Sequence, residues 1–126
     1  MKKTKHDGEI RRFIKHFDGA QDVFMNGCCY WFARILNGRF SAMLANDMHV
    51  GYILYEPVEG HFLFGVADVR ELHGDDRAFE YYDIRGNVTR FYKGKELYTI
   101  RRMIDEMPDY YDHLMRNCRD FEDDED

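Results

Sequence analysis

Two adjacent cysteines, Cys28 and Cys29, stand at the start of an aromatic and apolar run that continues to Leu36. They follow Asn26 and Gly27, a pair of residues typical of turns. This order predicts a thiol at the N-terminus of a buried helix, where free amides and the helix dipole stabilise a thiolate. A thiolate is a nucleophile, whereas a free cysteine elsewhere is commonly a small buried hydrophobic residue. The groups that could surround the thiol therefore decide its role.

A histidine and an aspartate occur later, in two segments with the composition of β-strands. His61 begins one apolar run and Asp83 lies near the end of another, with a polar stretch between them. If residues 70–76 form the tip of an antiparallel hairpin, His61 lies opposite about residue 84 and therefore beside Asp83. An aspartate beside a histidine fixes the imidazole tautomer and stabilises its cation. Together with a thiol at a helix start, this pair predicts a Cys-His-Asp triad.

The elements that would position these groups are helices flanking a sheet. Apolar residues recur at helical spacing from about Asp7 to Phe17, and again after the cysteines. The cysteine helix is expected to run from about Cys28 to Asn37 and to stop at Gly38. It is apolar on most sides, which predicts a central and buried helix.

Three strands and a C-terminal helical region complete the pattern. The strands are expected at residues 50–55, 61–67 and 78–84, and an apolar helical stripe begins at Leu97 and is interrupted at Pro108. We therefore predict an α+β fold: a central cysteine-bearing helix packed on a small antiparallel sheet of three or four strands, with flanking N- and C-terminal helices.

The acidic charge of the chain is concentrated at one end. Residues 120–126 contain six acids and no base, and they account for the whole formal net charge of −6, so residues 1–119 are neutral. Such a like-charge block is typically a disordered, solvated tail. We predict a single domain over residues 1–119 followed by an acidic disordered tail. No basic stripe is visible, so direct binding of nucleic acid is not expected.

The cysteine count and the apolar runs bear on the compartment. The chain has three cysteines, Cys28, Cys29 and Cys118. Their odd number and the adjacent pair do not fit a disulfide framework, and their spacing is not that of zinc ligands. No disulfide, metal site or other cofactor is therefore expected. No apolar run is long enough to span a bilayer, and no apolar signal-peptide region follows the basic start. These features predict reduced thiols in a cytoplasmic protein, within a host cell, that makes no membrane contact.

The segment from Gly27 to Ala33 resembles the signature of the papain-like and transglutaminase-like cysteine-nucleophile fold: glycine, any residue, cysteine, an aromatic residue and a hydrophobic run ending in Phe-Ala. In that family a histidine and then an aspartate follow on neighbouring strands, as His61 and Asp83 do here. The chain also resembles small uncharacterised phage or mobile-element proteins with the pattern NGCCYWFA…HF…YDI-G. The resemblance covers about residues 26–88.

The resemblance implies a role for each matching residue. Cys29 aligns with the nucleophile, His61 with the general base and Asp83 with the orienting carboxylate. The family has Trp directly after the cysteine, whereas Tyr30 follows Cys29 here, so Cys28 stays a competing nucleophile. The oxyanion donor is unassigned: the amide of the nucleophile and the side chain of Asn26 are candidates, and Asn26 can equally cap the helix.

Two functions fit these features. The first is a cysteine-dependent acyl-transfer enzyme of the peptidase, deamidase or transglutaminase type, which acts through a thioester on a protein or peptide substrate. The alternative is a phage-encoded, non-catalytic binding protein that inhibits a host defence protein, as anti-CRISPR proteins do, by means of an acidic surface or the acidic tail. Neither the target nor the oligomeric state follows from the sequence.

Overall fold

The computed structural model describes residues 5–17, 29–71 and 79–125, without the side chains of residues 5, 71, 79 and 117–125. Its elements in chain order are α1 (Lys5–Lys15), α3 (Cys29–Asn46), β1 (His49–Glu56), β2 (His61–Asp68), η1 (Val69–Glu71), β3 (Phe79–Asp83), β4 (Gly86–Asn87), α4 (Thr89–Tyr92), β5 (Tyr98–Thr99), α5 (Ile100–Glu106) and α6 (Pro108–Glu125). The strands form one antiparallel sheet in the order β4-β3-β2-β1-β5. The predicted α+β class is confirmed. The sheet has five strands instead of the predicted three or four. The sequence does not reveal β4 and β5, because each has only two residues and is too short to produce an alternating pattern.

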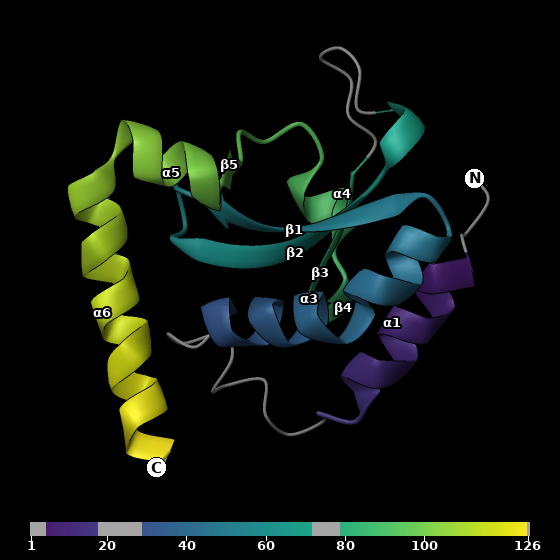
Figure 1. The fold of residues 1–126 in the computed structure, drawn as a ribbon, viewed down its shortest axis with the longest axis horizontal. Coiled ribbons are helices and arrows are strands. Elements are labelled where there is room, and N and C mark those ends of the chain that lie inside the picture. The colour runs from purple at the N-terminus through teal and green to yellow at the C-terminus, as the bar shows by residue number, and fades with distance from the viewer. Residues whose placement is uncertain (1–4, 18–28, 72–78, 126) are drawn as a thin grey trace.

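Helix α3 packs across one face of the sheet, with α1 beside it, while α4 lies on the other face (Figure 1). Helices α5 and α6 lie at the end of the molecule where α3 begins (Figure 1). The core between α1, α3 and the sheet consists of Ile10, Ile14, Phe32, Ala33, Leu36, Phe40, Leu44, Phe64, Val66, Tyr82 and Ile84. A separate cluster at the start of α3 contains Cys29 together with residues of β1, β2, α5 and α6.

Helix α3 is longer than the sequence predicts. The expected end is Gly38, but the helix continues to Asn46. A glycine inside a helix costs about 1 kcal/mol relative to alanine. Beyond it, Phe40 and Leu44 bury their side chains against the sheet, and each contributes about 1.5–3 kcal/mol. The packing of these two residues therefore outweighs the stop signal.

Gly51 of β1 lies against side chains of the core that leave no room for a Cβ atom. A Cβ atom at this position would lie 2.7 Å from Cε1 of Phe64 and 3.1 Å from Oδ1 of Asn37. The Phe64 ring is fully buried, so it cannot move aside without disturbing its neighbours. We expect Gly51→Ala to lower the free energy of unfolding by about 1–3 kcal/mol, measured by urea denaturation.

Gly38→Ala is the matched control for that substitution. No atom lies within 4 Å of a Cβ added at Gly38, and alanine is the better helix former, so this variant should be up to about 1 kcal/mol more stable than the wild type. An unchanged stability in Gly51→Ala would mean that Phe64 can repack, contrary to the expectation.

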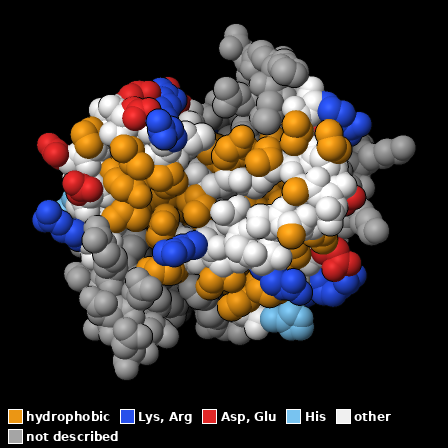
Figure 2. Space-filling model, viewed as in Figure 1, with side chains coloured by type: hydrophobic (Ala, Val, Ile, Leu, Met, Phe, Trp, Pro, Cys, Tyr) orange, Lys and Arg blue, Asp and Glu red, His pale blue; other side chains and the backbone are white. Residues whose placement is uncertain are grey.

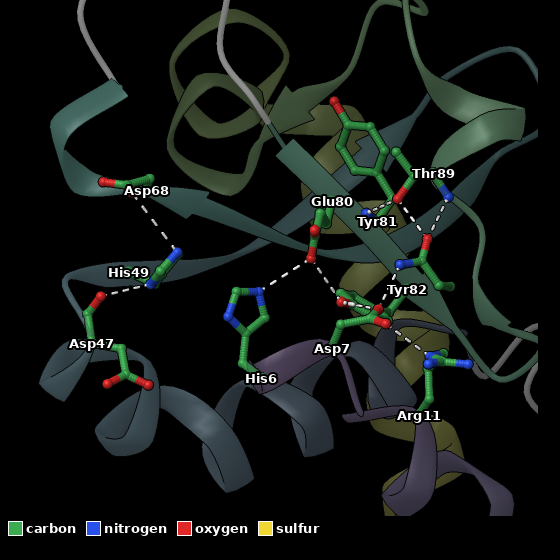
Figure 3. Close-up of polar contacts among 11 residues, drawn as sticks. His6, Asp7, Arg11, Asp47, His49, Asp68, Glu80, Tyr81, Tyr82 and Thr89 are labelled. Atoms are coloured by element: carbon green, nitrogen blue, oxygen red, sulfur yellow. Dashed lines mark hydrogen bonds and ion pairs between the residues drawn. The ribbon is translucent and has the colours of Figure 1, made fainter. Parts of the chain in front are cut away.

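Polar groups of α1 attach this helix to β3 and β4 (Figure 3). Asp7 Oδ1 lies 2.8 Å from the Tyr82 hydroxyl and accepts a hydrogen bond from Asn87 Nδ2 at 2.7 Å. His6 Nε2 lies 3.1 Å from Glu80 Oε2. The His6 hydrogen bond is the main reason why the pKa of Glu80 is lowered. Because His6 and Asp7 are buried, these bonds offset the cost of removing polar groups from water.

The C-terminal region is divided as the sequence predicts at Pro108, which is the first residue of α6. Proline is well suited to this position because the first helical amide has no partner within the helix. Helix α6 runs to Glu125 and so includes residues 120–125 of the acidic segment, whereas the sequence predicts a disordered tail there.

Candidate active site

Cys29 is the first residue of α3 and the first member of the buried stripe that this helix turns toward the sheet. Its side chain is 8% exposed, and its sulfur accepts a hydrogen bond from the backbone amide of Phe62 at 3.4 Å. The amides of the first turn of a helix have no intrahelical partners and carry the positive end of the dipole. Cys29 therefore lies among backbone N–H groups that can stabilise negative charge on sulfur.

His61 begins β2, directly after Gly60, whose φ of 70° allows the chain to turn out of β1. Strand β2 pairs with β3 so that Phe64 lies opposite Tyr82. This register is shifted by one residue from the predicted one. The shift matters because side chains alternate between the faces of a sheet, so the predicted register would have put His61 and Asp83 on opposite faces.

In the observed register His61 and Asp83 are diagonal neighbours on the same face of the sheet. His61 Nε2 lies 2.9 Å from Asp83 Oδ2, and each residue is 4% exposed. The bond to Nε2 leaves Nδ1 as the ring nitrogen for exchange of a proton with another group. The imidazole also interacts with the Cys29 side chain. The three residues of the predicted triad therefore come together, although they belong to α3, β2 and β3.

The Asp83 carboxylate is held from two sides. Besides the contact with His61, it accepts hydrogen bonds from the Arg85 backbone amide at 2.8 Å and from Arg85 Nη2 at 2.6 Å. Burial alone would raise the pKa of Asp83, but the hydrogen bonds from His61 and Arg85 outweigh burial and lower it. The bond to the Arg85 amide is the side-chain turn that aspartate commonly forms at the end of a strand. Asp83 thus has a local structural role as well as its contact with His61.

The charge state of His61 follows from the same contacts. Burial would lower the pKa of the imidazole, but the hydrogen bond with Asp83 and the interaction with Cys29 prevail and raise the pKa from 6.5 to about 9. At neutral pH the ring is therefore predominantly the imidazolium. An imidazolium between a carboxylate and a thiol is the arrangement in which a cysteine gives up its proton to form an ion pair.

Sequence reasoning missed Arg85 and Tyr92. The Tyr92 ring stacks on the His61 imidazole with 6.2 Å between the ring centroids, and its hydroxyl accepts a hydrogen bond from Arg85 Nη2 at 3.1 Å. The tyrosine therefore contacts both His61 and the residue that holds Asp83. Arg85 lies in the turn that follows β3, and an aspartate that ends a strand commonly accepts a hydrogen bond from the backbone two residues on, so the spacing of Asp83 and Arg85 is a usable signal. Tyr92 lies on α4, a four-residue helix without a readable period.

Two sequence-predicted residues, Cys28 and Asn26, lie outside the described residues, so the structure assigns neither of them a place. Among the residues that it does describe, no three His, Cys, Asp or Glu side chains are grouped so that they could hold a metal ion. The chemistry available in the described part of the site is that of a thiol, an imidazole and a carboxylate.

No protein-family model, curated protein or solved structure matches this chain. Within residues 5–17, 29–71 and 79–125, no helix combines the length and the apolar character needed to cross a membrane.

Proposed function

We propose that this protein is a cysteine-dependent acyl-transfer enzyme that acts through a thioester. The observation that carries the proposal is the buried hydrogen bond between His61 and Asp83, made by an imidazole that also interacts with Cys29 at the start of α3. Resemblance to the papain-like and transglutaminase-like fold implies the same three residues in the same order. The substrate class is an amide or ester carbonyl, most simply in a protein or peptide.

The reaction divides into two steps. The Cys29 thiolate attacks the carbonyl carbon, a C–S bond forms and the carbonyl electron pair moves onto oxygen. When the tetrahedral intermediate collapses, the bond to the amine or alcohol breaks, and the His61 imidazolium gives that leaving group its proton. Water or an amine then attacks the thioester, His61 accepts its proton, and the Cys29 thiolate is released.

The cost of burial supports a role for His61 beyond stability. Removing a charged pair from water is expensive, and apolar residues of similar volume commonly stabilise a fold as well or better. Asp83 is already satisfied locally by two bonds from Arg85. A buried imidazole held on this carboxylate and directed at a thiol is therefore an arrangement that catalysis explains and packing does not require.

Selective alkylation tests the proposal. At pH 6 we expect iodoacetamide to modify Cys29 at least ~10-fold faster than Cys28 or Cys118, because an imidazolium stabilises the thiolate only at a cysteine beside His61. Peptide mass spectrometry gives the rate at each cysteine, and Cys28→Ala and Cys118→Ala are the controls. Slow, equal labelling of all three thiols would contradict the proposal, and fast labelling of Cys28 would transfer the nucleophile's role to it.

The non-catalytic alternative predicts different variants to be inactive. A protein that inhibits a host defence protein through its acidic segment should lose its effect in the cell when residues 120–126 are removed, and should keep it in Cys29→Ala. An acyl-transfer enzyme should show the reverse. The concentration of acids in the last turns of α6 is the feature that favours this second function.

A further inference from the structure

A pair of tyrosine hydroxyls lies beside the Cys29 cluster. Tyr55, the next-to-last residue of β1, is fully buried, and its hydroxyl oxygen lies 2.5 Å from that of Tyr110. Tyr110 belongs to the first turn of α6 and is 42% exposed. The C-terminal helix therefore brings a hydroxyl from the protein surface to a buried partner in the sheet.

The register of the sheet directs Tyr55 toward the thiol. Tyr55 lies opposite Phe62 in the pairing of β1 with β2, and their ring centroids are 4.7 Å apart. The backbone amide of Phe62 is the donor to Cys29 Sγ. A Cβ atom added at Gly60 would lie 3.4 Å from the Tyr55 hydroxyl oxygen, which puts this hydroxyl close to the residue that precedes His61. The Tyr55 side chain thus belongs to the same cluster as Cys29, and its hydroxyl reaches Tyr110 of α6 at the edge of that cluster.

The pair can act as a hydrogen-bond donor. Burial and the hydrogen bond with Tyr110, followed by the negative charge that Cys29 and Glu56 can carry, raise the pKa of Tyr55 well above its usual value. The phenol therefore keeps its proton at every pH at which the protein would work. Two hydroxyls hold two protons, and their mutual bond uses one of them, so the second proton can be directed at a substrate.

We propose that the Tyr55–Tyr110 hydroxyl pair donates the hydrogen bond that stabilises the oxyanion formed when Cys29 attacks an acyl substrate. This inference rests on the proposed function and supplies the donor that the sequence left open between Asn26 and a backbone amide. As the C–S bond forms, the carbonyl π electrons become a lone pair on oxygen, and the hydroxyl pair donates to that oxygen without transferring its proton. When the intermediate collapses, the oxygen becomes a carbonyl again and the hydrogen bond weakens.

One member of the hydroxyl pair lies at the protein surface on the side of α6, because Tyr110 is 42% exposed. Figure 2 shows hydrophobic side chains gathered over the α5 and α6 side of the molecule, and the exposed apolar residues of these helices include Ile104 and Tyr110. An acyl group that approaches along this surface would meet Tyr110 before it reaches the buried thiol. Helix α6 would then complete the site rather than only cover it.

Two reactions of the same thiol separate an oxyanion donor from a structural tyrosine. Acylation by p-nitrophenyl acetate passes through a tetrahedral oxyanion, whereas alkylation by iodoacetamide displaces iodide and forms none. We expect Tyr55→Phe, Tyr110→Phe and the double variant to lower the rate of acylation, the double variant by ~10²–10³-fold, as loss of an oxyanion donor does. Alkylation at Cys29 should stay within about 2-fold of the wild type, because only the charge state and exposure of the sulfur set it. Release of p-nitrophenolate measures the first rate and peptide mass spectrometry the second.

Tyr111→Phe is the matched control, since Tyr111 is the next residue of α6 and packs against the cluster that contains Cys29. It should leave both rates unchanged. Equal losses of acylation and alkylation in Tyr110→Phe would show that the tyrosine acts on the thiol or on the fold, which overturns the inference. Unchanged acylation in the double variant overturns it as well. A wild-type protein that is acylated no faster than free cysteine at the same pH contradicts the proposed function itself.

Discussion

Replacing His61 with alanine lowers the rate of acylation at Cys29 by ~10²–10⁴-fold, the range that general acid–base catalysis contributes. The variant loses the cation that favours the thiolate and also the proton donor for the leaving group. Alkylation at pH 6 should fall too, because Cys29 is one of the groups that raise the pKa of His61, and the imidazolium in turn favours the thiolate. Rates of p-nitrophenolate release and of iodoacetamide labelling, measured from pH 5 to about pH 9, give the two effects separately.

His6→Ala is a close control for that experiment. His6, like His61, is buried and lies about 3 Å from a carboxylate, in this case that of Glu80. It belongs to the polar contacts that attach α1 to the sheet (Figure 3). Its loss should destabilise the protein without changing the rate of acylation per folded molecule. Equal effects of the two substitutions on acylation would mean that His61 only supports the fold.

The parts of the fold that the sequence predicts are the longer elements, which have either a periodic apolar face or a continuous apolar run. The stripe that begins at Cys29 in α3 is of the first kind, and strands β1 and β2, whose burial does not alternate, are of the second. The short elements β4, α4 and β5 are held by tertiary contacts, as Tyr92 is by its stacking on His61. Local sequence contains no record of such contacts.

The sequence predicts which residues form the candidate site, but it does not predict how they are arranged. The sequence pairs His61 with Asp83 through a hairpin whose predicted register is one residue away from the observed one. Residue types and chain order are enough to select the pair, but the face on which each side chain lies depends on the register alone. The stacking of Tyr92 on His61 and the hydroxyl pair contributed by Tyr110 depend on where α4 and α6 pack, which a single sequence does not specify.

The contacts of Asp83 with His61 and Arg85 make this carboxylate important for stability. Asp83→Ala should therefore lower the free energy of unfolding by about 3 kcal/mol or more. The substitution leaves the buried His61 imidazole and the Arg85 guanidinium without their common partner. Arg85→Ala should cost less, because the Arg85 side chain is 38% exposed and water already solvates part of it. Urea denaturation at pH 6 measures both variants.

The pH dependence of stability identifies the charge pair behind that loss. The pKa of His61 is raised from 6.5 to about 9 on folding, so its contribution is complete below pH 6.5 and disappears as the pH rises to about 9. The pKa of Asp83 is lowered from 3.8, so its contribution is complete above that value and disappears as the pH falls. In Asp83→Asn, which keeps an oxygen for the Arg85 amide, the decrease in stability between pH 6.5 and 9 should become much smaller. An unchanged decrease would assign the effect to a group other than the His61–Asp83 pair, and the charge on His61 would then not stabilise the fold through Asp83.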